Sequence, residues 1–323
     1  MALALLERYR DRLPVGAETP VVSLGEGSTP LVHAPRLSAR LGLDLWLKWE
    51  AANPTGSYKD RGMTLAVSKA IEAGARSLIC ASTGNTAASA AAYGARAGVP
   101  VVVLQPAGAV AAGKLAQTRA LGARVLEVQG SFDAALAAAR ELAARGEHAL
   151  VNSVNPHRVE AQKTAVFEIV EELGGAPDAF VVPYGGGGNT SAYSLGLAEL
   201  GLDARLVSVE AADRPRTEAS AIRIAEPAHA ERVAASGAEI VTLDDAAIRA
   251  GWEALAREEG LFCEPASAAG VAALLVDEGL LRGARVVCTV TGHGLKDPGY
   301  ADRHAPAPEA VEADADAIAA AAS

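Results

Sequence analysis

RSLICASTGNTAASAAAYGARAGVPVVVLQP, residues 76–106, is the stretch that decides the fold. It holds an apolar run (76–82), an Ala-rich helical segment (85–98) and a second apolar run (99–106). Neither run alternates strongly between apolar and polar residues, which is typical of strands in a parallel sheet covered on both faces. A strand, a helix and a strand in this order predict a right-handed βαβ unit.

The same alternation of strand-like and helical segments continues along the chain. Helices are expected at KLAQTRALG (114–122) and FDAALAAARELAARG (132–146), with a strand, ARVLEVQ (123–129), between them. Further strand-like runs are LWLKWE (45–50), HALVNSV, DAFVVPY, ARLVSVE, AEIVTLD and ARVVCTVT. The pattern predicts an α/β fold, and 323 residues are enough for two domains that share one cleft.

Composition and charge exclude several classes of protein. The net charge is −10 and no stripe of Lys or Arg offsets it, so we expect neither a nucleic-acid partner nor a membrane partner. No signal peptide or membrane span is recognisable. The odd number of cysteines and the lack of CxxC and HExxH patterns predict a reduced, cytoplasmic chain without a metal site. Residues 304–323, HAPAPEAVEADADAIAAAAS, are expected to form a disordered acidic tail.

A glycine-rich turn follows the strand-like run 178–183. There the chain reads Tyr184, Gly185, Gly186, Gly187, Gly188, Asn189, Thr190 and then turns helical. Consecutive glycines leave backbone N–H groups uncovered at a helix N-terminus, which is a nest for a phosphate. No GK[ST] follows, so the turn is not a nucleotide P-loop.

Two other interpretations of this turn stay open on its own residues. One is a plain flexible loop. The other is a dinucleotide site in an NAD-dependent dehydrogenase, since GxG is present and Glu210 ends the next strand, where a ribose-binding acid would lie. Thr190 at the third glycine position argues against the dinucleotide site.

A lysine motif, NPTGSYKDRG (53–62), follows the strand-like run 45–50. Pro54, Gly56 and Ser57 end that strand, and a helix is expected to begin near Ser57, so that Lys59 lies in its first turn. A lysine in such a cleft can act as a Schiff-base nucleophile and then as a proton shuttle. The alternative is a solvated lysine beside Asp60 and Arg61.

NPTGSYKDRG resembles the pyridoxal-phosphate lysine motif of the family shared by threonine synthases, serine/threonine dehydratases and the tryptophan synthase β chain. Other blocks follow in the family's order: EGSTPL (26–31), ASTGNTAASAAAYGARAG, VNSVNPHR (151–158), the glycine turn, REEGLFCEPASAAG (257–270) and TVTGHGLKD (289–297). The resemblance spans residues 20–300, and NSVNPHR and TGHGLKD look specifically like threonine synthase.

The resemblance implies two open, mostly parallel twisted sheets covered by helices, the tryptophan synthase β-like fold. A large cofactor-binding domain would comprise residues 1–50 and 151–303. A smaller α/β domain, residues 51–150, would carry the lysine and the loop for the substrate carboxylate. The family also suggests a homodimer.

The resemblance assigns residue roles as well. For pyridoxal 5'-phosphate these are Lys59 as the covalent and catalytic residue, Asn85 at the ring oxygen, Thr291 at the pyridine nitrogen, and Gly185, Gly186, Gly187, Gly188 and Asn189 at the phosphate. For the substrate they are Ser82 and Thr86 at the carboxylate and Asn152, Ser153 and Arg158 at the substrate's own phosphate. Taken singly, these polar residues could equally be helix caps or turn residues.

The implied reaction is the conversion of O-phosphohomoserine and water to threonine and phosphate. Three departures from the family pattern leave room for a related enzyme. Gly186 stands where Asn is common, Tyr58 replaces the commoner Phe, and the segment after Glu210 is shorter than in typical members. The nearest alternative is another β- or γ-replacement or elimination, such as a threonine dehydratase. A cofactor-free binding protein would leave the lysine motif unexplained.

Overall fold

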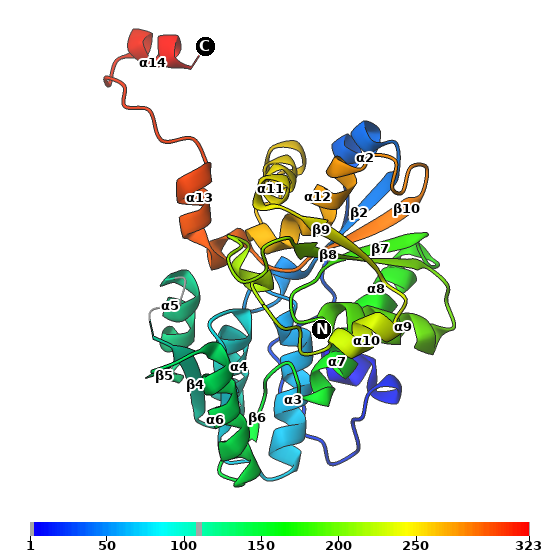
Figure 1. The fold of residues 1–323 in the computed structure, drawn as a ribbon, viewed down its shortest axis with the longest axis vertical. Helices are drawn as coiled ribbons and strands as arrows, with labels where there is room; N and C mark the ends of the chain where they lie inside the picture. The colour runs from blue at the N-terminus through cyan, green and yellow to red at the C-terminus, as the bar shows by residue number, and fades with distance from the viewer. Residues whose placement is uncertain (1–2, 108–111, 323) are drawn as a thin grey trace.

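The computed structural model describes residues 3–107 and 112–322 and contains two sheets, which confirms the predicted α/β fold. In the six-stranded sheet the strand order is β1-β2-β10-β7-β8-β9, and in the four-stranded sheet it is β5-β4-β3-β6. All neighbouring strands are parallel except β1 and β2. In Figure 1 the large sheet lies in the upper half of the molecule and the small sheet at the lower left.

The large sheet collects strands from both ends of the chain: β1 (Leu31–His33), β2 (Asp44–Trp49), β7 (Ala179–Pro183), β8 (Arg205–Ala211), β9 (Glu239–Leu243) and β10 (Arg285–Val290). One face is covered by α2 (Pro35–Leu41), α11 (Asp245–Glu259) and α12 (Ala269–Val276), and the other by α8 (Thr164–Leu173) and α9 (Gly188–Leu200). Helix α10 (Ala230–Ala235) precedes β9.

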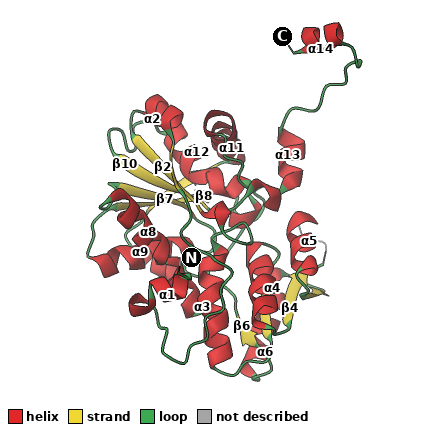
Figure 2. Ribbon diagram, turned by 180° about the vertical axis from the view of Figure 1, so that it is seen from behind, coloured by secondary structure: helices red, strands yellow, loops and turns green. Residues whose placement is uncertain are grey.

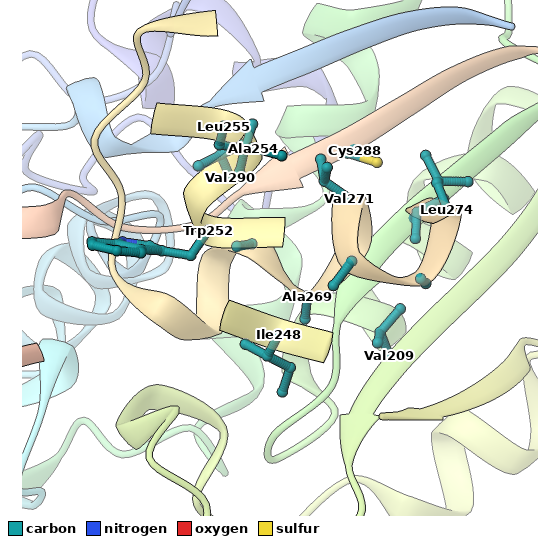
Figure 3. Close-up of a cluster of buried hydrophobic side chains, with 14 of the residues drawn as sticks. Val209, Ile248, Trp252, Ala254, Leu255, Ala269, Val271, Leu274, Cys288 and Val290 are labelled. Atoms are coloured by element: carbon teal, nitrogen blue, oxygen red, sulfur yellow. The ribbon is translucent and has the colours of Figure 1, made fainter. Parts of the chain in front are cut away.

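Alternate residues of β7 explain why its sequence is apolar throughout. Val181 packs into the core under α11 and α12, whereas Phe180 and Val182 pack against α8 and α9. Figure 3 shows part of the first core, in which Val271 of α12 lies beside Cys288 of β10 and Trp252 of α11 lies at the other end of the cluster. A strand that is buried on both faces needs an apolar side chain at nearly every position.

The small sheet consists of β3 (Leu78–Ala81), β4 (Val101–Pro106), β5 (Arg124–Val128) and β6 (Ala149–Leu150). Helices α3 (Lys59–Glu72) and α4 (Asn85–Ala97) share a core with one face, and α6 (Phe132–Ala144) packs on the other. Helix α5 (Ala112–Ala120) links β4 to β5, and α7 (Pro156–Gln162) follows β6. From behind, α1 (Leu5–Arg8) lies beside α3, where Leu5, Leu6 and Leu65 share a small core (Figure 2).

The structure differs from the sequence-based expectations in some details. The short edge strand β1 was not expected, and only Ala149 and Leu150 of the run HALVNSV form a strand. The helix of the lysine motif begins at Lys59 itself rather than near Ser57. Residues 51–150 include every strand of the small sheet, but the division into two domains stays a proposal.

The C-terminal segment leads away from the rest of the molecule after α13 (Pro298–His304), as Figure 1 shows. It contains a short helix, α14 (Ala315–Ala321), that the sequence did not suggest and that buries no residue. The disordered tail therefore stays a prediction. Within the described ranges, no helix is both long enough and apolar enough to cross a bilayer.

Candidate active site

A cleft of about 920 Å³ opens where strands of both sheets end. Its walls come from the turns after β3, β6, β7 and β10 and from the start of α3. Every residue that the sequence suggested for cofactor or substrate lines it: Lys59, Ser82, Asn85, Thr86, Asn152, Ser153, Arg158, Gly185, Gly186, Gly187, Gly188, Asn189 and Thr291. The cleft thus brings together segments that lie far apart in the sequence.

Lys59 is the first residue of α3 and reaches into this cleft. Its Nζ donates a hydrogen bond to Tyr58 Oη at 2.5 Å. The preceding loop is tied to the end of β10, because Tyr58 N donates to Thr291 O at 3.0 Å and His293 N donates to Gly56 O at 2.9 Å. The lysine is therefore held at the carboxyl end of the large sheet although its helix packs on the small one.

The Asp60 side chain holds the loop that precedes Lys59 through hydrogen bonds. Its carboxylate accepts hydrogen bonds from Thr55 N and Oγ1, both at 2.7 Å, and from Ser89 Oγ at 2.6 Å. Burial raises the pKa of Asp60 to about 6, against these hydrogen bonds. Asp60 is fully buried, so its carboxylate serves this loop and not a solvated surface, whereas Lys59 is partly exposed in the cleft.

The glycine turn connects β7 to α9 as expected. Gly187 is the N-cap of α9 and has φ of +84°, a conformation that only glycine adopts readily. A Cβ on it would lie 2.9 Å from Val233 Cγ2. In the described part of the chain, the N–H groups of Gly186, Gly187 and Gly188 donate to no protein acceptor, and Asn189 Nδ2 is buried without a partner. Unpaired donors at a helix N-terminus form a site for a phosphate.

Thr291 follows β10 and is buried at the cleft wall. Its Oγ1 shares a 2.7 Å hydrogen bond with Ser267 Oγ, which also accepts the N–H of Gly292 at 2.8 Å. These two neutral hydroxyl groups could hydrogen-bond a pyridine-type ring nitrogen without bringing a charge to it, as a carboxylate would.

Asn85 stands at the start of α4, after the N-cap residue Gly84. Its Nδ2 donates to Glu264 Oε1 at 2.6 Å, and among the described residues its buried Oδ1 has no partner. Glu264 Oε2 lies 3.0 Å from Lys114 Nζ, and both of these side chains are almost completely buried. We did not anticipate Glu264 or Lys114, because their pairing depends on packing between distant segments.

Arg158, on α7, is 1% exposed. Its Nη1 donates to Val151 O at 2.9 Å, whereas its buried Nε and Nη2 find no acceptor among the described residues. Burial lowers the pKa of Arg158 from its usual value. A buried guanidinium with free N–H groups is costly unless an anion completes it. The cleft therefore contains a second anion site besides the glycine turn.

The other expected substrate contacts differ in what they can offer. Asn152 uses its side-chain amide on the backbone of Ala81, accepting from its N–H at 2.9 Å and donating to its C=O at 2.7 Å. One Nδ2 hydrogen and one lone pair of Oδ1 are left over, so the amide can hold Ala81 and still contact a ligand in the cleft. Ser153 and Thr86 are partly exposed in the cleft, and Ser82 Oγ accepts from Gly84 N at 3.1 Å.

The segment after β8 forms one side of the cleft. Arg214 holds it, donating to Glu210 Oε2 at 2.8 Å, Gly185 O at 3.0 Å and Ile224 O at 3.2 Å. Glu210 also accepts from Thr242 Oγ1 at 3.0 Å, so its carboxylate is engaged within the fold and is not a free ribose ligand.

His229, which we did not predict, connects the two anion sites. Its Nε2 lies 3.0 Å from Ser153 O, and its backbone N donates to Gly186 O at 3.1 Å. Burial lowers the pKa of His229. Because a carbonyl oxygen can only accept, Nε2 carries the proton in this contact.

These observations fit a phosphorylated aldehyde cofactor. The cleft offers a lysine amine, unpaired donors at a helix N-terminus for a phosphate, a hydroxyl at the end of β10 and an amide with a free oxygen. It also contains Arg158, whose Nε and Nη2 have no acceptor among the described residues.

Comparison with known proteins agrees with this geometry. Residues 22–292 match the family model described as pyridoxal-phosphate dependent enzyme. The chain is 49% identical to a threonine synthase of Synechocystis sp. over 91% of this chain and 83% of that protein. It is 48% identical to one of Mycobacterium tuberculosis over 97% and 94%.

Solved structures show the same fold at lower sequence identity. A cysteine synthase from Entamoeba histolytica superposes with a TM-score of 0.79 at 21% identity, over 93% of this chain and 94% of that one. An O-ureido-L-serine synthase gives 0.76 at 21%, over 95% and 100%. The chain therefore belongs to the family of pyridoxal-phosphate-dependent enzymes, and pyridoxal phosphate is its cofactor.

Proposed function

We propose that this protein is a threonine synthase, a lyase that converts O-phosphohomoserine and water to threonine and phosphate. Relatives named threonine synthase match most of the chain at 43–49% identity. The observation that carries the proposal is Arg158, whose buried guanidinium has unpaired N–H groups in the same cleft as Lys59. A dehydratase acting on threonine has no phosphate for this arginine to bind.

Holding the cofactor is the first task of these residues. We assign the covalent Schiff base to Lys59 Nζ and the phosphate to the N–H groups of the glycine turn and to Asn189. Asn85 would face the ring oxygen, and the Thr291 hydroxyl would face the ring nitrogen. When bound, the cofactor supplies an electron sink for the charge that develops at the substrate Cα.

The substrate would lie between α4 and α7. We assign its carboxylate to Ser82 and Thr86, on the turn that begins α4, and its phosphate to Arg158 and Ser153. Asn152 would contribute by holding this segment against Ala81, since its amide is engaged there. Two separated anion sites select a substrate that carries both a carboxylate and a phosphate.

Proton transfer falls to Lys59. Its amine would take the Cα proton of the substrate and would then move protons at Cβ and Cγ while phosphate leaves from Cγ. Water finally adds at Cβ. A single base that is anchored at the start of a helix and reaches the substrate from one side can serve these successive steps.

Release of inorganic phosphate from O-phosphohomoserine, with threonine appearing in equal amount, tests the proposal. O-phosphoserine and threonine serve as competing substrates. We expect turnover of O-phosphohomoserine alone. Formation of 2-oxobutanoate from threonine without phosphate release would instead identify a dehydratase and overturn the assignment.

We also propose that the enzyme is a cytoplasmic homodimer. In the described residues, Cys80, Cys263 and Cys288 are buried free thiols, which suits a reducing compartment. The dimer rests on family resemblance, and light scattering of the purified enzyme at micromolar concentration tests it. A mass of one chain would contradict it.

A further inference from the structure

Tyr58 directly precedes Lys59 in the lysine motif and contacts its amine. Its hydroxyl accepts the 2.5 Å hydrogen bond from Lys59 Nζ, and the same nitrogen lies 4.3 Å from the centre of its ring. The ring alone could attract the lysine cation, as a Phe ring would. The hydroxyl adds a group that can both accept and donate a proton at the catalytic amine.

Tyr58 is the N-cap residue of α3, and one turn further along this helix lies next to Arg158 of α7. Gly62 follows Tyr58 by one helical turn, and a Cβ on Gly62 would lie 2.6 Å from Arg158 Nε. The missing side chain at Gly62 thus leaves room for the guanidinium. Tyr58, Lys59 and Arg158 all line the cleft. Burial lowers the pKa of Arg158, and Tyr58 exerts the largest opposing effect on it.

We propose that Tyr58 is a catalytic residue whose hydroxyl relays a proton from Lys59 to the phosphate that leaves at Arg158. This rests on the proposed function. A phosphate monoester dianion that left without a proton would depart as a trianion, so the step needs an acid.

In the relay, one N–H bond of the Lys59 ammonium breaks and an O–H bond forms on Tyr58. The original Tyr58 proton moves to the ester oxygen as the bond between that oxygen and Cγ breaks, and the bonding electrons stay on the oxygen. The electron pair left at Cβ by removal of its proton forms the Cβ=Cγ double bond in the same step. Lys59 ends as a neutral amine, hydrogen phosphate is released, and Tyr58 is unchanged. No further acid or redox partner is required.

Tyr58→Phe tests the relay because it removes only the hydroxyl and keeps the ring over Lys59. Two reactions of the holoenzyme are compared: phosphate release from O-phosphohomoserine, and exchange of the Cα proton with D₂O in the phosphonate analogue, which cannot lose phosphate. We expect kcat for phosphate release to fall about 10-fold to 100-fold, at the lower end of general acid–base effects. The exchange rate, the cofactor absorbance and KM should stay within about twofold.

The matched control is Tyr9→Phe, the same change at a tyrosine that contacts Glu171 outside the cleft. It should leave both reactions of the holoenzyme unchanged. Equal losses of exchange and phosphate release in Tyr58→Phe would mean that the hydroxyl only positions Lys59, and a wild-type rate of phosphate release would mean that it has no role. Either result overturns the relay. If the wild-type enzyme itself releases no phosphate, the proposed function fails, and the relay fails with it.

Discussion

Arg158 shows how one residue can reveal the chemistry of a site. A guanidinium that is 1% exposed loses most of its hydration, yet within residues 3–107 and 112–322 only Nη1 is paired, with Val151 O. Such an arrangement is stable only if the remaining N–H groups gain a charged acceptor during function. Because the glycine turn can hold the cofactor phosphate, we propose that Arg158 binds the phosphate of the substrate.

Arg158→Ala should therefore lower kcat/KM for O-phosphohomoserine by about 100-fold, because a charge-assisted contact to the phosphate is lost. The enzyme should remain yellow, since the cofactor contacts are intact. Steady-state assays and the visible spectrum measure the two effects. Arg205→Ala, which removes an exposed ion pair with Glu239, is the control and should change neither. Loss of colour in Arg158→Ala would assign Arg158 to the cofactor instead.

At the scale of elements, the glycine turn forms the N-terminus of α9. Gly187 and Gly201 cap the two ends of this helix, both with positive φ. A Cβ at Gly187 would meet Val233 and His229, whereas one at Gly201 would meet nothing within 4 Å. The two positions therefore share backbone strain and differ in their surroundings.

Gly187→Ala should weaken pyridoxal-phosphate binding at least about 10-fold, because relieving the contact shifts the N–H groups that face the phosphate. Gly201→Ala should cost about 1 kcal/mol of folding stability and leave cofactor affinity unchanged. Absorbance titration of the apoenzyme measures affinity, and urea unfolding measures stability. Equal cofactor affinities of the two variants would show that the turn does not hold the phosphate.

A buried polar contact joins α5 and α4 to the segment before α12. There the Glu264 carboxylate lies between Lys114 and Asn85, and Gly292 gives it room, because a Cβ at Gly292 would lie 2.3 Å from Glu264 Oε1. With a carboxylate on one side, Asn85 must turn its NH₂ group toward Glu264.

Lys114→Met and Glu264→Gln should each destabilise the protein by about 3 kcal/mol, because each leaves an unpaired buried charge. The double variant should lose less folding stability than the sum of the two single losses. Urea unfolding of the four proteins gives the coupling energy. Losses that add without coupling would mean that the two side chains do not interact.

Local chemistry explains why much of the fold and part of the site can be predicted from the sequence. The strand, glycine turn and helix around Gly187 are contiguous, as are Pro54, Gly56 and Lys59. Tertiary contacts were not predictable. Asn152 has the residue type of a ligand contact, but its amide binds Ala81 across strands. The contact of His229 with Ser153 likewise has no signal in the sequence.

At the scale of the whole molecule, a buried ion cluster joins β2 and α8, on the large sheet, to α3, whose helix packs on the small sheet. Arg61 donates to Glu50 and Glu168, and Lys48 Nζ lies 3.0 Å from Glu168 Oε2. Burial would raise the pKa of Glu168, but Arg61 and Lys48 outweigh it and lower that pKa to about 2.

This lowered pKa predicts a pH dependence of stability. A carboxylate with a depressed folded-state pKa contributes stability above its ordinary pKa of 4.5, and that contribution is lost as the pH falls toward about 2. The shift corresponds to about 3 kcal/mol. In Glu168→Gln, the free energy of unfolding should be lower at pH 7, and its fall between pH 4.5 and 2 should be shallower than in the wild type. The control is Glu239→Gln, which removes an exposed ion pair and should show the same dependence of unfolding free energy on pH as the wild type. If Glu168→Gln also showed the wild-type dependence, the ion cluster would be unimportant for stability.

Reduction of the purified yellow enzyme with borohydride, followed by peptide mass spectrometry, tests the central claim most directly. The account predicts one reduced pyridoxyl-phosphate label, on Lys59 in the peptide that contains NPTGSYKDRG. A label on Lys114 or any other lysine, or a protein that takes up no label, would contradict it.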